Sequence, residues 1–230
     1  LGGTFNPVQI GHLRLAVETT ERLGCDRLVF LPGHAPRHRD LSHLLPFDLR
    51  IALLVAATRD EGAFVVDDAE RRHPDAPYSR ELLPRLCRDA GIDDASFVLG
   101  LEQFERLPSW FRGRELPDVV DLVVCGREER GEAMFADLVA RFWTDFSPIA
   151  APSEGTIAFE RSDGRRIVHL AVPRIDVSST LVRRLWRQRR SIAHLVPDPV
   201  LELLEQNRAM VDAAWADEAE RRGRGEPPVS

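Results

Sequence analysis

The sequence of 230 residues contains no lysine, a single tyrosine and only three cysteines. All 31 basic residues are arginines, so any phosphate contact from a basic side chain must come from a planar, permanently charged guanidinium. Cys25, Cys87 and Cys125 are widely spaced and form neither a C-x-x-C pair nor an obvious disulfide framework. We therefore expect a reducing, cytoplasmic environment.

A long apolar run is also missing. Crossing a bilayer takes about 20 apolar residues, whereas the longest candidate, residues 51–57, is closed off by Arg50 and Arg59. No basic segment followed by a hydrophobic stretch opens the chain, so no secretory signal is predicted. The net charge of −6 argues against a protein that coats nucleic acid. We expect neither a membrane nor a nucleic acid as a partner.

Short apolar runs alternate with longer segments of helical spacing. The runs are residues 28–31, 64–66, 96–99, 122–124 and 167–172. Apolar side chains recur at helical intervals in residues 13–23 and 51–58. Nearly continuous apolar strands separated by helices are typical of a parallel sheet covered on both faces. The predicted fold class is therefore α/β, a doubly wound, Rossmann-like sheet that binds ligands at the carboxyl ends of its strands.

The chain shows no internal repeat and no interdomain linker. We expect one domain over residues 1–210, with a small helical part at its C-terminal end. Residues 153–166 contain two glycine turns and are interpreted as an irregular excursion before the last strand. Residues 211–230 are largely charged and end in a Pro/Gly-rich segment, which predicts a disordered tail.

A glycine-rich motif, GGTFNPVQIGHL, occupies residues 2–13 and precedes a predicted helix. Gly2 and Gly3 would let a phosphate approach the backbone, and the helix start would offer free N–H groups and the positive end of its dipole. Gly11 stands before His12, whose imidazole would face that anion. A lone histidine in a helix is more often structural, so a functional role depends on the complete motif. Such motifs follow a strand, and we expect most of that strand to be missing before Leu1.

The motif resembles the GGTFDPxHxGH signature of the nucleotidylyltransferase superfamily, in the form used by bacterial nicotinate-mononucleotide adenylyltransferases. Further segments are similar to motifs of that family and follow in the same order. They are residues 31–39, 48–50, 70–79, 100–110, 177–183 and 195–197. The resemblance runs from Leu1 to about Asn207. It implies the joining of ATP and nicotinate mononucleotide into nicotinate adenine dinucleotide and pyrophosphate, with Mg²⁺ accompanying ATP.

The resemblance implies an ATP site built from both ends of the chain. His12 would stabilise charge on the phosphates, and Arg39, in the position of a family lysine, and Arg183 would be further catalytic groups. The implied ATP-binding residues are Gly2, Gly3, Thr4, Phe5, Gln9, Gly11, His12, Ser178, Ser179, Thr180 and Arg183. The attacking phosphate has a second pKa of about 6 and is largely ionised, so no general base is required. Catalysis then reduces to alignment and charge neutralisation.

A second group of residues is implied for the mononucleotide. Its members are Arg39, Tyr78, Ser79, Gly100, Glu102 and Trp110. The Trp110 ring would stack on the pyridine, while the backbone around Tyr78 and Ser79 would bind the carboxylate. Backbone N–H donors prefer a carboxylate to a neutral amide, so nicotinate is expected rather than nicotinamide. No metal site formed by side chains is predicted, since Mg²⁺ would be held mainly by water and phosphate oxygens.

Three residues depart from the family pattern. Gln9 replaces the first motif histidine, Glu102 replaces an aspartate, and Pro77 replaces a serine and removes a possible N–H donor. Replacing a charged hydrogen bond by a neutral one costs about 1–2 kcal/mol in the transition state, or a roughly 5–30-fold slower reaction. We therefore predict that Gln9→His raises kcat.

Two alternatives stay open. The chain could be a nucleotidylyltransferase for another acceptor, such as nicotinamide mononucleotide. It could also be a diverged, nucleotide-binding paralogue with weak or no activity, for which Gln9 is the main argument. The sequence leaves a homo-oligomer open.

Overall fold

The structure is a computed structural model that describes residues 1–34, 43–126 and 128–216, without the side chains of residues 128–130. Its strands are β1 (Gly2–Gly3), β2 (Leu28–Pro32), β3 (Phe64–Val66), β4 (Ser96–Gly100), β5 (Asp121–Gly126), β6 (Ser147–Ile149), β7 (Thr156–Glu160) and β8 (Arg166–Ala171). Strands β1, β2 and β3 pair in parallel in that order, and β4, β5 and β8 form a second parallel set. Strands β7 and β6 extend this second set with antiparallel pairing.

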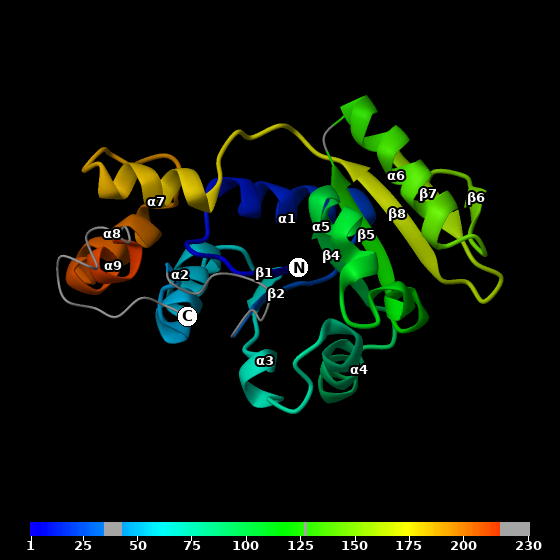
Figure 1. Ribbon diagram of the computed structural model, residues 1–230, viewed down its shortest axis with the longest axis horizontal. Coiled ribbons are helices and arrows are strands. Elements are labelled where there is room, and N and C mark those ends of the chain that lie inside the picture. The colour runs from blue at the N-terminus through cyan, green and yellow to red at the C-terminus, as the bar shows by residue number, and fades with distance from the viewer. Residues whose placement is uncertain (35–42, 127, 217–230) are drawn as a thin grey trace.

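Helices surround both sets of strands (Figure 1). They are α1 (Ile10–Leu23), α2 (Phe47–Thr58), α3 (Ala69–Arg72), α4 (Ser79–Ala90), α5 (Leu101–Arg106), α6 (Glu128–Phe142), α7 (Ser179–Arg187), α8 (Asp198–Gln206) and α9 (Arg208–Trp215), with the 3₁₀ turns η1 (Leu107–Ser109) and η2 (Gly113–Asp118). In Figure 1, α7, α8 and α9 gather beside α2, and β6, β7 and α6 lie at the opposite end of the molecule. The apolar runs and helical segments expected from the sequence are present, which confirms the α/β fold class.

Each face of the sheet has its own hydrophobic core. Val98 of β4 and Val123 of β5 belong to a cluster that includes buried residues of α1, α2 and α7–α9. Their neighbours along the strands, Phe97, Leu99 and Leu122, belong to a second cluster with α4, α5 and α6. Successive strand residues point to opposite faces, so this alternation is what helices on both faces require. The sheet is therefore doubly wound, as predicted.

The segment interpreted as an irregular excursion is partly a strand, which corrects the prediction. Residues 156–160 form β7, which pairs with β8 in a hairpin that turns at Asp163 and Gly164. Gly164 has φ of 88°, a conformation that glycine adopts without strain. Because β7 has only five residues and glycine turns lie on both sides of it, its sequence does not show a clear strand pattern.

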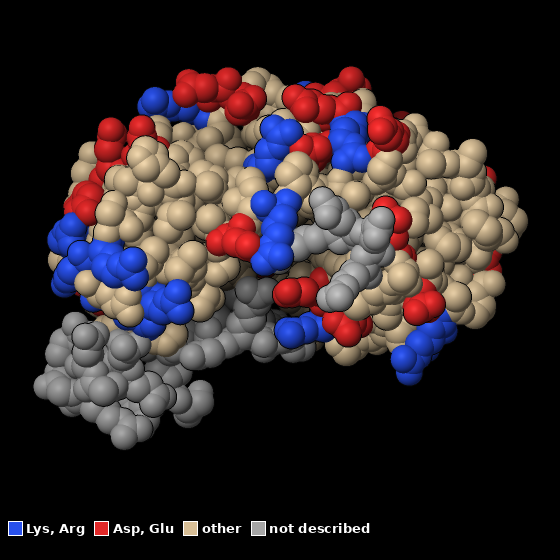
Figure 2. Space-filling model, turned by 90° about the horizontal axis from the view of Figure 1, so that it is seen from above, with Lys and Arg blue, Asp and Glu red and all other residues tan. Residues whose placement is uncertain are grey.

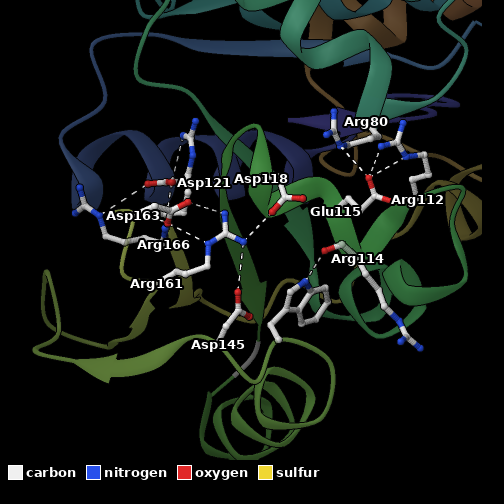
Figure 3. Close-up of polar contacts among 12 residues, drawn as sticks. Arg80, Arg112, Arg114, Glu115, Asp118, Asp121, Asp145, Arg161, Asp163 and Arg166 are labelled. Carbon is white, nitrogen blue, oxygen red and sulfur yellow. Dashed lines mark hydrogen bonds and ion pairs between the residues drawn. The ribbon is translucent and has the colours of Figure 1, made fainter.

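An arginine at this hairpin ties three parts of the chain together (Figure 3). Arg161 lies 2.7 Å from Asp118 of η2, 3.5 Å from Asp145 before β6, and 2.7 Å from Asp163 in the turn. The hydrogen bond from Arg161 lowers the pKa of Asp163 to about 2. The cluster serves the fold, since the three carboxylates share the guanidinium of Arg161 and are thereby held close together.

The C-terminal boundary also differs from the expectation. Helix α9 continues to Trp215, and both Val211 and Trp215 are fully buried. The Trp215 ring meets the Trp186 ring edge-on at 5.7 Å. A tail that begins at residue 211 is therefore wrong for residues 211–216, because two large apolar side chains hold this stretch against α7. Residues 217–230 lie outside the described part.

No described helix is both long and apolar enough to cross a membrane. On the face shown in Figure 2, acidic and basic side chains of the described residues are interspersed rather than gathered into one broad patch of a single sign.

Candidate active site

The glycine-rich motif folds as β1, a tight loop and the first turn of α1. Gln9 is the N-cap residue of α1 and is only 5% exposed. Its Oε1 accepts a hydrogen bond from the Gly11 N–H, and its Nε2 donates to the Val177 carbonyl at 3.3 Å. A Cβ on Gly11 would stand 2.8 Å from that Oε1, so any larger residue here would displace the Gln9 amide. The Gln9 side chain therefore joins the start of α1 to the segment before α7.

The first N–H groups of α1 all have partners. The Ile10 N–H donates to the Leu195 carbonyl at 3.1 Å, and the His12 N–H donates to the Gln9 carbonyl at 2.9 Å. The Gly11 N–H is taken by the Gln9 side chain. The expectation of free N–H donors at this helix start is therefore wrong. What α1 presents to an anion is the positive end of its dipole and the His12 ring.

The half-buried His12 ring is held in one tautomer. Its Nδ1 accepts a hydrogen bond from the Gln9 N–H at 3.2 Å, so the proton of the neutral ring resides on Nε2. The Phe5 ring packs edge-on against it at 5.1 Å, and burial lowers the pKa of His12 to about 4. Phe5 itself has φ of 48°, a left-handed conformation that is uncommon for a bulky residue and recurs at functional sites.

The start of α7 meets this motif, although the two segments are far apart in the sequence. Ser178 is the N-cap residue of α7, and the Ser179 hydroxyl donates to the Pro7 carbonyl at 2.8 Å. From the next turn, Arg183 donates through Nη1 to the Asn6 carbonyl at 2.9 Å. The sequence-predicted residues of the motif and of α7 thus lie together, although more than 160 residues separate them.

The start of α7 remains accessible. Ser178 and Thr180 are exposed, and Arg183 is half-buried. Arg183 also donates through Nη2 to the Thr180 hydroxyl at 3.3 Å. This helix start, unlike that of α1, presents two exposed hydroxyl groups beside a guanidinium.

Arg50 of α2 fastens the loops that surround the motif. Its side chain is fully buried and donates to four carbonyls, those of Thr4, Gly33, His34 and Leu45, at 2.6–3.2 Å. Burial lowers the pKa of the guanidinium to about 10, so it stays charged near neutral pH. The sequence placed this arginine in a family-like segment, but nothing in the pattern showed its bracing role.

A cavity of about 430 Å³ lies between the glycine motif, α4 and the η1–η2 turns. Gly2, Gly3 and Thr4 line it, as do the strand residues Leu31 and Leu99. The expected position of a ligand near the carboxyl ends of the strands agrees with this arrangement.

Aromatic side chains line the same cavity. Trp110 is held by a tight turn, in which its N–H donates to the Leu107 carbonyl and its carbonyl accepts from the Gly113 N–H, both at 3.0 Å. A Cβ on Gly113 would stand 1.9 Å from the Leu107 carbonyl oxygen, so this turn requires glycine. Tyr78, the N-cap residue of α4, stacks on the Phe111 ring at 4.4 Å.

Three charged side chains of the described residues line the cavity. They are Glu70, Arg80 and Arg106, none of which was among the sequence-predicted site residues. Burial raises the pKa of Glu70, whose carboxylate accepts a hydrogen bond from the His34 N–H at 2.7 Å. Glu70 and Arg106 fall within family-like segments of the sequence, but only the fold shows that they and Arg80 line one cavity.

The remaining predicted residues separate into three groups. Tyr78, Ser79 and Trp110 line the cavity together. Gly100 and the exposed Glu102 do not line it. The α5 residues that line it are Gln103 and Arg106. Arg39 lies outside the described residues.

No group of three or more potential metal ligands occurs among the described residues. A divalent cation at this site would therefore depend on ligands other than a cluster of described side chains, such as substrate phosphates and water.

A doubly wound sheet, a histidine and an arginine in the first turns of two helices, and a cavity beside the glycine motif are features that fit a nucleotidyltransferase. The chain belongs to the cytidylyltransferase-like family, whose model matches residues 1–185. The family resemblance inferred from the motifs is thereby confirmed.

The names of similar curated proteins are more specific than the name of this family. A probable nicotinate-nucleotide adenylyltransferase of Geobacter metallireducens is 32% identical over 208 residues, which cover 90% of this chain and 95% of that protein. A protein of the same name from Methylococcus capsulatus is 34% identical over 210 residues, which cover 89% and 95% of the two chains.

A solved structure has the same fold. The nicotinic acid mononucleotide adenylyltransferase of Plasmodium falciparum, complexed with APC, superposes with a TM-score of 0.65 at 12% identity. The superposition covers 91% of this chain and 94% of the other.

Proposed function

We propose that this chain transfers the adenylyl group of ATP to nicotinate mononucleotide, forming nicotinate adenine dinucleotide and pyrophosphate in NAD biosynthesis. The observation that carries the proposal is the meeting of the glycine motif with the start of α7, next to a cavity lined by Trp110 and the start of α4. The relatives named nicotinate-nucleotide adenylyltransferase support the same acceptor. The Plasmodium enzyme has also been solved in complex with NaAD, and that structure superposes with a TM-score of 0.64.

The reaction is an in-line displacement at the α-phosphorus of ATP. An oxygen of the mononucleotide phosphate forms the new bond, the bond to the β-phosphate oxygen breaks, and pyrophosphate leaves. Because the attacking phosphate is already largely ionised near neutral pH, the protein need not remove a proton. Its tasks are to align two nucleotides and to balance the charge that develops on the leaving phosphates.

His12 and Arg183 are suited to the second task. The tautomer fixed by the Gln9 N–H leaves the Nε2–H of His12 as a donor toward a phosphate oxygen. A triphosphate beside this ring would raise the pKa of His12 from its value of about 4, because an adjacent anion favours the imidazolium. Arg183 supplies a permanent positive charge, and Ser178 and Thr180 supply hydroxyls at the same helix start.

We assign ATP as its magnesium complex, with the cation arriving on the triphosphate. Gly2, Gly3 and Thr4 would place their backbone between the two nucleotides, since they line the cavity and precede His12. Trp110 would stack on the pyridine ring, and the N–H groups at the start of α4, around Tyr78 and Ser79, would receive the carboxylate.

The test is an acceptor assay with the purified full chain. Magnesium ATP is supplied with nicotinate mononucleotide or with nicotinamide mononucleotide, and the dinucleotide and pyrophosphate are measured. We expect turnover with nicotinate mononucleotide to exceed turnover with the amide. His12→Ala should lower kcat by about 10²–10³-fold, as the loss of a preorganised donor to the transition state does. His194→Asn is the matched control, because His194 is exposed and its φ of 64° is one that asparagine tolerates.

No pyrophosphate from either acceptor, with a folded protein, would contradict the proposal. Calorimetric binding of ATP without turnover would instead favour the diverged, nucleotide-binding paralogue.

A further inference from the structure

The walls of the cavity carry more positive than negative charge. Among the described residues, Arg80 and Arg106 line it, together with one acidic residue, Glu70. Apolar side chains, including Leu82, Leu83 and Phe97, line the rest of the wall near α4. In such an environment a charged pair interacts more strongly than it does in water. A ligand with a negative group at its apolar ring would fit these walls better than a neutral one.

Arg80 forms a long ion pair with Glu115, and its buried Nε has no hydrogen-bond partner among the described residues (Figure 3). Its Nε lies 3.8 Å from Glu115 Oε2, beyond hydrogen-bond distance, and is buried without a hydrogen-bond partner among the described residues. The Glu115 carboxylate is already bonded by Arg112, whose Nε donates at 2.8 Å. Glu115 therefore orients the Arg80 side chain without accepting its Nε–H, and this donor is left for another acceptor.

The backbone next to Arg80 favours the same kind of ligand. The first intrahelical bonds of α4 are made by Glu81 and Leu82, which both donate to the Tyr78 carbonyl at 2.9 Å. The earlier N–H groups, those of Ser79 and Arg80, do not donate to the Tyr78 side chain, which makes no capping hydrogen bond. The residue before this turn, Pro77, also lines the cavity and has no N–H to offer.

We propose that Arg80 is a specificity-determining residue, whose guanidinium receives the carboxylate of the pyridine substrate and so selects the acid over the amide. This inference rests on the proposed function. Trp110 would hold the ring, and Arg80 would add a charged donor to the N–H groups at the start of α4, where Pro77 has no N–H to offer. A guanidinium presents two parallel N–H donors that match a carboxylate, whereas a carboxamide offers one acceptor and carries no charge.

The selectivity should depend on the charge of residue 80. A hydrogen bond to a charged group is worth roughly 10–100-fold in affinity, and Arg80 retains 21% side-chain exposure, which weakens it. Arg80→Gln should therefore lower kcat/KM for nicotinate mononucleotide by about 10–30-fold and change kcat/KM for nicotinamide mononucleotide by less than about threefold. Arg80→Lys keeps the charge and should retain more of the preference than Arg80→Gln.

The experiment compares kcat/KM for both mononucleotides in the wild-type chain, Arg80→Gln, Arg80→Lys and Arg85→Gln. Arg85 is the matched control, because it lies on the same helix, pairs with Asp75 at 2.6 Å and does not line the cavity. We expect the acid-to-amide ratio to fall in Arg80→Gln alone by about tenfold or more. An unchanged ratio, or an equal loss for both substrates, would overturn the inference.

A binding measurement separates this inference from the proposed function. Quenching of tryptophan fluorescence reports the affinity of each mononucleotide without any turnover. If the wild-type chain turns over neither mononucleotide, the proposed reaction fails. The inference about Arg80 then stands only if Arg80→Gln selectively weakens the binding of nicotinate mononucleotide, and it falls if both affinities stay the same.

Discussion

Gln9→His is the change that most sharply separates a catalytic role of this position from a structural one. Comparison with the motif predicts a gain, because a histidine can carry charge beside the ATP phosphates and glutamine cannot. The structure adds a cost. Gln9 is buried, caps α1 through Oε1 and reaches the Val177 carbonyl through Nε2.

The two effects can be given magnitudes. Losing the hydrogen bond to the Val177 carbonyl costs about 0.5–1.5 kcal/mol of stability. Weakening the cap of α1 adds about 1 kcal/mol at most, since an imidazole Nδ1 can still accept from the first turn. The gain in the transition state is about 1–2 kcal/mol, which corresponds to a roughly 5–30-fold rise in kcat. We therefore expect a faster enzyme that unfolds more easily.

The assay measures kcat with saturating magnesium ATP and nicotinate mononucleotide, together with the free energy of unfolding in urea. Gln9→Ala is the matched comparison, because it loses both hydrogen bonds and gains no charge, so both kcat and stability should fall. An unchanged or lower kcat for a folded Gln9→His chain would refute the reasoning. It would mean that the pocket has adapted to glutamine.

Two further predictions concern the groups buried around the site. Arg50→Met leaves four carbonyls without their donor and should lower the free energy of unfolding by about 3–5 kcal/mol in urea titrations, whereas a loss below about 1 kcal/mol would contradict the bracing role. Because burial lowers the pKa of His12 from 6.5 to about 4, the unfolded chain binds this proton first as the pH falls. Stability from this group should be complete above about pH 6.5 and fall by roughly 1–3 kcal/mol toward pH 4. That slope should be smaller in His12→Gln, and equal slopes in the two proteins would contradict it.

The strands and the long helices could be predicted because their patterns are local. The run at residues 122–124 is buried on both faces, and the spacing in residues 13–23 gives α1 one apolar side. The meeting between the glycine motif and α7 is not local, and it could be expected only from the family resemblance. In contrast, β7 is a short strand between two glycine turns, and α9 is held by the burial of Trp215 rather than by a clear helical pattern.

The candidate site could be predicted only where a motif carried it. Of the residues predicted to bind the mononucleotide, Tyr78, Ser79 and Trp110 line the cavity, whereas Gly100 and Glu102 do not. The roles of Gln9 and Arg50 stayed hidden because each depends on carbonyls that the folded backbone brings close. Arg80 stayed hidden for a similar reason, since its partner Glu115 lies 35 positions further along the chain.

The central claim is that this chain joins ATP to nicotinate mononucleotide. The most direct measurement is the formation of nicotinate adenine dinucleotide, and of an equal amount of pyrophosphate, by the purified full chain with magnesium ATP. We expect both products, with nicotinate mononucleotide preferred over nicotinamide mononucleotide and with most activity lost in His12→Ala. A folded chain that releases no pyrophosphate with either acceptor would contradict the account.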